Sequence, residues 1–349
     1  MTKKRIEWLD IAKGICILLV VLGHELTWNE KLRYLIYAFH IPMFFILSGM
    51  TAYITKETEK NFKAFFAKNA NALLKPYIMV SFCYILFDIA WGGVQKRFSA
   101  RIVIYDLYQT LVGYGINVLW FIITLFLAKI ILYLVLKIKK NGIIKFVVLC
   151  ILGIILIELT SVLAGAVSHT QLQNPIMWLF IGIFRPFLAV AFVYMGFILY
   201  PVICKMLSEK DNAEFRVLLY SFCTLVILIP AFFRMKITMV NMISEPAWMI
   251  MVSGMIGSLG MINVSIMLER ISVLKRILCF FGRNSLIIML THEYLQVRSS
   301  IQTMCEGVIG NHVAALIMTF TGVLVVETII CFLWLYCKKQ IINARNYIQ

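Results

Sequence analysis

Charged residues are scarce in this chain of 349 residues. Only 14% of the residues are charged, whereas 62% are hydrophobic, and the mean hydropathy is +0.89. So little charge argues against a soluble protein and indicates an integral membrane protein. The net charge of +16 does not indicate nucleic-acid binding, because the basic residues flank apolar segments, as they do in membrane proteins.

Sequence signals of several other classes are also missing. The nine cysteines lie almost all inside apolar runs, without a C-x-x-C pair or a spacing typical of metal ligands. We therefore interpret them as buried small hydrophobic residues and expect no bound metal. The basic start of the chain, Lys3 to Arg5, leads into a helix that lacks a small-residue cleavage site. We expect this helix to be retained rather than removed as a signal peptide.

What the sequence has is a series of long apolar segments. We predict ten membrane-spanning helices of about 20 residues each. They cover residues 11–28, 32–54, 73–91, 117–138, 143–163, 176–203, 216–233, 247–268, 277–297 and 313–336. The segments between them are too short to form a soluble domain. We therefore expect residues 1–349 to form a single all-α, polytopic membrane helix bundle.

The distribution of basic residues predicts how this bundle is oriented. If the N-terminus is cytoplasmic, 22 of the 33 Lys and Arg residues lie on the cytoplasmic side and 8 lie outside. Such a bias toward one side is typical of the cytoplasmic loops of membrane proteins. We therefore predict a multi-pass protein of the inner or plasma membrane with both termini in the cytoplasm.

The first helix carries ionisable residues where a membrane helix normally has none. Lys13 and His24 are eleven residues apart, which places them within about 20° of each other on one helix face and roughly 16 Å apart along the axis. Asp10 lies about 40° away on the same face. Such groups are costly in a membrane and usually face a bundle interior, so we favour a functional pair. The alternative is a lysine that snorkels to the headgroups and a histidine that caps a neighbouring helix.

The second predicted helix contains the motif FHIPMFFILSGM, residues 39–50. Pro42 removes a backbone hydrogen bond, and Ser48 and Gly49 allow another helix to approach closely. His40 enters the membrane a short hairpin after His24, so the two imidazoles should lie at a similar depth. His40 is either part of a site or a packing histidine bonded to carbonyls that Pro42 leaves free.

These two motifs resemble those of the acyltransferase family 3 membrane proteins, in particular the branch similar to fucose 4-O-acetylases. Further stretches resemble family positions as well, and the resemblance runs from end to end. The residues that carry it are Asp10, Lys13, Gly14 and His24, then His40, Pro42, Phe44, Phe45, Leu47, Ser48 and Gly49, then Lys75-Pro76-Tyr77, Trp120-Phe121 and GRNSLIIMLTH from Gly282 to His292. Many members have Arg in place of Lys13 and more basic residues before the third helix, where this chain has Lys68 and Lys75.

The resemblance implies transfer of an acyl group, usually acetyl, from cytoplasmic acyl-CoA to a hydroxyl of a cell-surface glycan or its lipid-linked precursor. In this scheme Lys13 binds the CoA phosphates as a point charge, and His24 is the general base. Asp10 is expected to pair with Lys13. The expected partners are acyl-CoA, the glycan acceptor and the lipid bilayer, with no nucleic acid and no bound cofactor.

Seven further residues are predicted to contribute to substrate binding. They are His40, Ser48, Lys75, Trp120, Asn284, Ser285 and His292. Glu293, next to His292, either completes the acceptor site or belongs to an ordinary polar helix end. We expect Glu327 to have a buried partner such as Arg185 or a tyrosine, and we expect Arg185-Pro186 to break the sixth helix.

Two other functions are compatible with parts of this pattern. A solute or glycan-precursor transporter would also have intramembrane charges and broken helices, but the two halves of the chain show no internal repeat. A scaffold subunit of a glycan export machine would leave the shared face of Lys13 and His24 unexplained.

Overall fold

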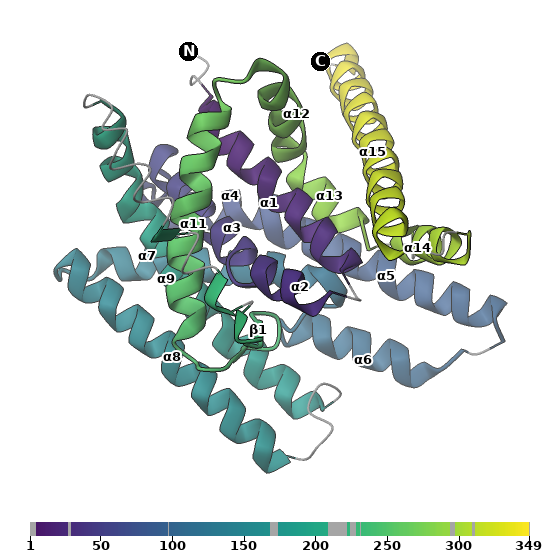
Figure 1. Cartoon of the computed structure of the whole chain (residues 1–349), viewed down its shortest axis with the longest axis horizontal. Coiled ribbons are helices and arrows are strands. Elements are labelled where there is room, and N and C mark those ends of the chain that lie inside the picture. Colours follow the sequence, from purple (N-terminus) through teal and green to yellow (C-terminus); the bar gives the residue numbers. More distant parts are fainter. Residues whose placement is uncertain are drawn as a thin grey trace.

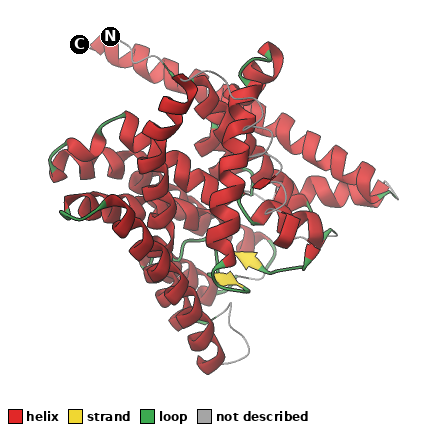
Figure 2. Ribbon diagram, turned by 60° about the vertical axis from the view of Figure 1, so that its left-hand side comes forward, coloured by secondary structure: helices red, strands yellow, loops and turns green. Residues whose placement is uncertain are grey.

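The computed structural model of this chain is almost entirely helical (Figures 1 and 2). It describes residues 5–26, 29–96, 98–167, 174–208, 222–223, 228–230, 232–293, 297–308 and 311–348. The strands β1 (Ile237–Thr238) and β2 (Ile243–Ser244) form a short antiparallel hairpin. The prediction of an all-α membrane bundle is confirmed in its main feature.

Most of the described helices are separated by short connections. Before the hairpin they are α1 (Glu7–Glu25), α2 (Glu30–Tyr37), α3 (His40–Ile54), η1 (Glu57–Glu59), α4 (Phe62–Asn69), η2 (Ala70–Leu74), α5 (Lys75–Val94), α6 (Ala100–Leu111), η3 (Asn117–Leu119), α7 (Trp120–Lys137), α8 (Gly142–Val167) and α9 (Pro175–Ser208). After it they are α11 (Met249–Leu268), α12 (Ser272–Arg283), α13 (Ser285–Thr291), α14 (Val297–Val308) and α15 (His312–Ile348).

Seven segments of the described chain are long and apolar enough to cross a membrane. They are Glu30–Ile54, Phe62–Val94, Asn117–Lys137, Gly142–Ala166, Pro175–Leu207, Met249–Leu268 and His312–Gln340. These segments overlap the second to sixth, the eighth and the tenth predicted spans. The chain is therefore a multi-pass membrane protein.

The three remaining predicted spans differ from these seven for separate reasons. The helix α1 has 19 residues, but Glu7, Asp10 and Lys13 make it less apolar. The predicted span 277–297 is divided at Asn284 into α12 and α13. The predicted span 216–233 lies mostly outside the described residues. The count of ten spans stays a prediction.

The start of α1 and the end of α15 lie at the same end of the bundle (Figure 1). This placement agrees with the prediction that both termini are on one side of the membrane. The assignment of that side to the cytoplasm stays a prediction.

Glycine residues allow the central helices to approach closely. A Cβ atom on Gly14 of α1 would collide with the Leu278 carbonyl of α12, and a Cβ atom on Gly282 of α12 would collide with the Asp10 carbonyl of α1. The α1–α12 pair is thus in backbone contact on both sides, as is typical where small residues line a membrane helix interface.

The contact between α3 and α9 is built in the same way. A Cβ atom on Gly49 would collide with the Val193 carbonyl, and one on Gly196 would collide with the Ile46 carbonyl. This confirms the prediction that another helix approaches the second helix at Gly49. The pairs α1–α12 and α3–α9, which are joined through α1–α3 contacts, form the centre of the bundle.

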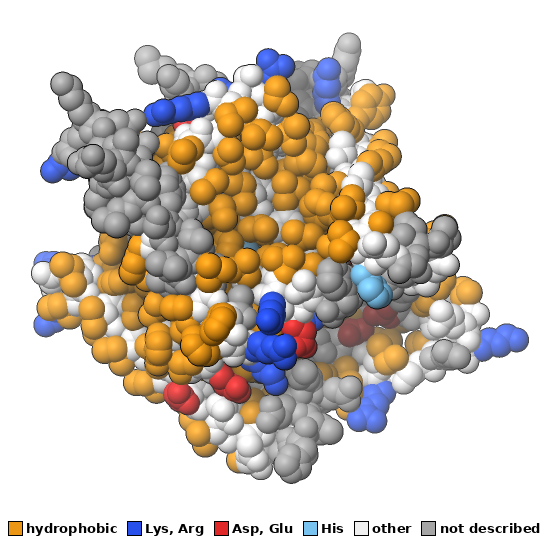
Figure 3. Space-filling model, in the orientation of Figure 1, with side chains coloured by type: hydrophobic (Ala, Val, Ile, Leu, Met, Phe, Trp, Pro, Cys, Tyr) orange, Lys and Arg blue, Asp and Glu red, His pale blue; other side chains and the backbone are white. Residues whose placement is uncertain are grey.

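The peripheral helices expose large apolar side chains to the surroundings. Helix α15 exposes Val313, Ile317, Met318, Val325, Ile329 and Phe332, and α5, α6 and α8 have similar exposed faces. Figure 3 shows a broad hydrophobic surface on one face of the molecule, with Lys and Arg side chains mainly above and below it. Such a surface is typical of contact with lipid hydrocarbon chains.

The prediction of a break at Arg185-Pro186 is wrong. Helix α9 runs from Pro175 to Ser208 and includes both Pro186 and Pro201. A proline removes only one backbone hydrogen bond from a helix, and α9 is held by packing against α3, α7 and α8. The arginine therefore projects from a continuous helix.

Candidate active site

Helices α1 and α3 run in opposite directions and place their polar residues at two matching levels. At one level, Lys13 Nζ donates a hydrogen bond to Thr51 Oγ1 at 3.4 Å. At the other level, His24 and His40 line the same cavity. Lys13 and His24 are eleven residues apart in α1, and His40 and Thr51 are eleven residues apart in α3. Each separation corresponds to roughly 16 Å along the helix axis. The prediction that the two imidazoles lie at a similar depth is confirmed.

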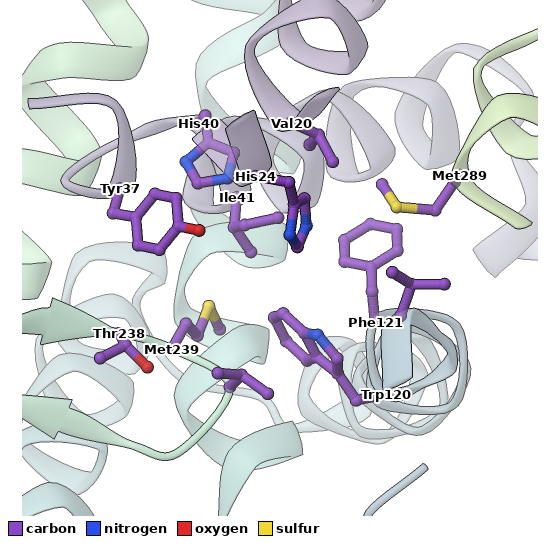
Figure 4. A pocket seen from close by; sticks show the side chains of 12 residues that line it. Val20, His24, Tyr37, His40, Ile41, Trp120, Phe121, Thr238, Met239 and Met289 are labelled. Carbon is purple, nitrogen blue, oxygen red and sulfur yellow. The ribbon is translucent and has the colours of Figure 1, made fainter. Parts of the chain in front are cut away.

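The cavity has a volume of about 90 Å³ and mostly apolar walls (Figure 4). It is lined by Val20, His24, Tyr37, His40, Ile41, Val118, Trp120, Phe121, Thr238, Met239, Val240 and Met289. In Figure 4, His24 and Trp120 face each other, with Tyr37 on one side and Phe121 on the other. Apolar walls with a few polar groups are typical of small-ligand sites.

His40 is buried, and its hydrogen bond determines which nitrogen carries the proton. Nδ1–H of His40 donates to the Ile36 carbonyl at 2.7 Å, because a carbonyl can only accept. The neutral ring then keeps its lone pair on Nε2. The carbonyl that Pro42 leaves free, that of Ala38, accepts from Ser253 Oγ at 3.2 Å instead. His40 is therefore not held by the carbonyl that Pro42 leaves free.

His24 is surrounded by residues from the end of α13 and from α14. Its ring centroid lies 5.3 Å from that of His292, and its Nδ1 lies 3.5 Å from Glu293 Oε1. Arg298 forms an ion pair with the same Glu293 oxygen and donates to the His24 carbonyl at 3.4 Å. Sequence reasoning missed Arg298, which it counted only as a basic residue outside the membrane.

His292 is fully buried beside His24. Its Nδ1–H donates to the Ile288 carbonyl at 2.8 Å, and its Nε2 has no hydrogen-bond partner among the described residues. We call His24, His292 and Glu293 the outer cluster, because they lie at the end of α1 that we predict to be extracytoplasmic.

The other end of α1 carries an inner charged cluster, formed by Arg5, Asp10, Lys13 and Arg283. Asp10 Oδ2 accepts from Arg5 Nε at 2.7 Å and from Arg283 Nε at 3.2 Å. The prediction that Asp10 forms an ion pair with Lys13 is therefore wrong, because Asp10 is engaged by two guanidinium groups. Within the described chain Lys13 has no ion pair of its own.

Sequence reasoning missed Arg283 as a member of this cluster. Arg283 is the second residue of the stretch from Gly282 to His292 that resembles the family, so the sequence offered a reason to consider it. Its contact with Asp10 could not be predicted, because nothing in the sequence indicates that α12 packs against the start of α1.

The structure brings together His24, His40, Trp120 and His292 but not the remaining predicted binding residues. None of Ser48, Lys75, Asn284 and Ser285 lines the cavity. Ser48 lies half-buried in α3, and Lys75 is exposed at the start of α5. Asn284 is buried and donates from Nδ2 to the Phe280 carbonyl at 2.8 Å, and Ser285 begins α13. Their roles stay predictions.

The buried carboxylate of Glu57 in η1 forms ion pairs with α4 and α7. Lys68 and Lys129 each approach a different carboxylate oxygen of Glu57 at 2.6 Å. Burial alone would raise the pKa of Glu57, but the two lysines hold this pKa below its usual value. Lys68, one of the two basic residues that we expected before the third helix, is thus paired with a carboxylate.

Arg185 is fully buried and bonds to three separate segments. Its Nε donates to Thr124 Oγ1 at 2.8 Å, its Nη1 to the Val240 carbonyl at 2.8 Å, and its Nη2 to the Gly113 and Tyr114 carbonyls at 3.1 and 2.7 Å. Its guanidinium carbon also lies 4.8 Å from the centroid of the Trp120 ring. Arg185 thus fixes two parts of the cavity wall.

Glu327 has a hydrogen-bond partner, as predicted, but this partner is Thr291 and neither Arg185 nor a tyrosine. The Glu327 carboxylate accepts a hydrogen bond from Thr291 Oγ1 at 2.6 Å. Thr291 is the last residue of α13, so this bond holds α15 against the helix that leads into the outer cluster.

The β hairpin separates the cavity from a second one of about 280 Å³. Residues 238–240 line the first cavity, and residues 241–244 line the second. The other residues of the second cavity are Ile157, Glu158, Thr160, Ser161, Ala164, Met177, Ile181, Glu245, Pro246 and Ala247. Arg185 holds the hairpin at Val240, and the Tyr114 hydroxyl holds it at Asn241 Oδ1 over 3.1 Å.

Comparison with known families finds one match that covers nearly the whole chain. A family model described as an acyltransferase domain matches residues 6–336. Comparison with curated proteins and with solved structures finds no match.

Proposed function

The chain belongs to acyltransferase family 3 and is a membrane acyltransferase, and we propose that it acts on a cell-surface glycan or its lipid-linked precursor. The donor in this proposal is cytoplasmic acyl-CoA, with acetyl as the transferred group and an extracytoplasmic hydroxyl as the acceptor. The proposed branch is the one that resembles fucose 4-O-acetylases. The observation that carries the proposal is the placement of Lys13 near the first third of α1 and of His24, with its cavity, at the other end of this helix.

The inner charged cluster supports an anionic donor. Lys13 has no ion pair among the described residues, so its ammonium group is available for a phosphate. Arg283 and Arg5 add positive charge, which Asp10 only partly offsets. A CoA molecule held there by its phosphates extends its thin pantetheine arm toward His24, along a distance of roughly 16 Å.

The outer cluster supports general base catalysis by His24. Glu293 lies on the Nδ1 side of the His24 ring and favours the tautomer with the proton on Nδ1. Nε2 then accepts the proton of the acceptor hydroxyl as its oxygen attacks the acyl carbon. In a direct transfer, the new C–O bond replaces the C–S bond, and the proton passes to the departing thiolate of CoA.

Mass spectrometry of surface glycans tests this proposal. Cells that produce the protein should carry glycans heavier by one acetyl group than glycans from cells without it, and alkali should remove this difference because it cleaves esters. Cells that produce the His24→Gln variant at the same level serve as the matched control. Identical glycans in all three strains, together with no transfer of labelled acetyl groups from acetyl-CoA in membranes, would reject the proposal.

Lys13 variants test the donor end. Lys13→Ala should raise the KM for acyl-CoA by about tenfold or more, because a charge-assisted hydrogen bond to a phosphate contributes about 1.5–3 kcal/mol. Lys13→Arg should retain most of the activity because the charge is kept. The control is Lys338→Ala, which removes an exposed basic residue from the end of α15. Equal KM values for wild type and Lys13→Ala would place the phosphates elsewhere.

A further inference from the structure

The outer cluster combines two imidazoles and a carboxylate from distant parts of the chain. One possible ligand atom from each of His24, His292 and Glu293 lies within 4.8 Å of the other two. From the sequence we expected no metal site, and this expectation was based on the cysteines alone. We propose that the outer cluster binds Zn²⁺ and that zinc bound there inhibits acyl transfer.

The distances in the cluster are close to those of a zinc site. Zinc binds nitrogen and oxygen ligands at about 2.0–2.2 Å, so neighbouring ligands of a tetrahedral ion lie about 3.3 Å apart. The distance between His24 Nδ1 and Glu293 Oε1 is already 3.5 Å. A small side-chain rotation brings the third ligand atom into range, since all three lie within 4.8 Å.

His292 is prepared as a metal ligand by its other nitrogen. Its Nδ1–H donates to the Ile288 carbonyl at 2.8 Å, which leaves the lone pair on Nε2. Histidines that bind metals commonly donate their second ring N–H to a carbonyl or carboxylate in this way. Nε2 is buried without a hydrogen-bond partner among the described residues, a cost that a metal ion would offset.

The ligand types favour zinc over the hard cations. Calcium and magnesium prefer sites built from oxygen atoms, whereas this cluster offers two imidazoles. Two histidines and one glutamate are a frequent ligand set of zinc sites that keep a fourth position open. Since His24 lines the cavity, that fourth position lies close to it.

Zinc binding removes the function that we propose for His24. A neutral imidazole has a single lone pair, so a ring bound to zinc through one nitrogen carries its proton on the other. Such a ring cannot accept the proton of the acceptor hydroxyl. The inhibitory effect therefore rests on the proposed function, whereas zinc binding itself does not.

Arg298 limits the affinity for zinc. It pairs with Glu293 and donates to the His24 carbonyl, so a metal ion must bind next to a guanidinium group. Removing this charge should strengthen zinc binding, whereas removing a ligand should weaken it. These opposite signs distinguish a real site from a general effect of the substitutions on the fold.

The binding test uses the purified full-length chain in detergent, titrated with Zn²⁺ by calorimetry and with Co²⁺ by visible absorption. Wild type should bind one ion per chain, with the absorption bands of a four-coordinate Co²⁺ site. His292→Ala and Glu293→Gln should each weaken binding at least about tenfold, and Arg298→Gln should strengthen it. The matched control is His312→Ala, which changes a histidine at the start of α15 outside the cluster.

The outcomes separate the two proposals. If wild type binds no zinc, or if Arg298→Gln and His292→Ala both bind zinc as wild type does, the metal site is wrong and the proposed function stands. If the protein binds zinc but its zinc-free form shows no acetyl transfer, the proposed function fails and the metal site stands. Transfer that continues at its full rate when the site is saturated with Zn²⁺ would overturn the inhibitory role. Recovery of transfer after EDTA is the expected result.

Discussion

The His24→Ala variant is expected to lose acyl transfer by about 10²–10⁴-fold in kcat, because the substitution removes a general base. Binding of acyl-CoA should stay close to that of wild type, since His24 lies at the opposite end of α1 from the inner charged cluster. The change should therefore appear in kcat and leave the KM for the donor almost unaffected.

The measurement is transfer of labelled acetyl groups in membranes, normalised to the amount of folded protein. Binding of acetyl-CoA to the purified variant is measured separately. His312→Ala is the control for loss of a histidine outside the site. A His24→Ala enzyme with wild-type kcat would show that another residue is the base. A variant that loses donor binding to the same extent as transfer would show that His24 contacts the donor.

Replacing Arg185 with methionine is expected to lower the stability of the bundle by at least about 3 kcal/mol. The substitution leaves three backbone carbonyls, those of Gly113, Tyr114 and Val240, without the donor that they have now. Each buried group left unpaired costs about 1–3 kcal/mol, and few waters are available inside a membrane protein to replace the donor. Methionine offsets part of this destabilisation, because the substitution also removes the desolvation cost of the buried guanidinium charge.

The loss of Arg185 should also reduce transfer per folded molecule. The guanidinium group holds the hairpin at Val240 and lies over Trp120, and both residues line the cavity. Arg185→Lys should not restore stability, because one ammonium group cannot reproduce the planar set of donors that reaches three segments.

The stability measurement is equilibrium unfolding in mixed micelles, followed by tryptophan fluorescence. Arg101→Met is the matched control, since Arg101 is exposed and its guanidinium group donates hydrogen bonds to the nearby Tyr105 hydroxyl. Equal unfolding midpoints for the Arg185→Met and Arg101→Met variants would show that the three segments hold together without the guanidinium group.

The membrane class and most helices of this protein could be predicted from its sequence, because both depend on local composition. Apolar segments of about 20 residues form helices in a membrane, because a helix is the structure in which a single segment makes all its backbone hydrogen bonds internally. Seven predicted spans overlap long apolar helices of the structure. Predictions failed where local rules compete with packing, as at Arg185-Pro186, where a continuous α9 is held by its neighbours.

The depth of residues along α1 and α3 was also within reach of the sequence. The rise per residue of a helix is constant, and the hairpin between the two helices is short. Lys13 therefore lies at the same level of the bundle as Thr51, and His24 lies at the same level as His40. Depth alone does not say which residues of later helices complete a site.

The sequence by itself thus determined an acyltransferase-like membrane bundle with a cation and an imidazole on one helix, while tertiary packing decided their partners. Asp10 pairs with Arg283, and His24 meets His292 and Glu293, because α12 and α13 pack against α1. Backbone contact at Gly14 and Gly282 decides that choice of neighbour. The physical reason is that periodicity acts within one helix, whereas the fit between two helix surfaces depends on residues far apart in the chain.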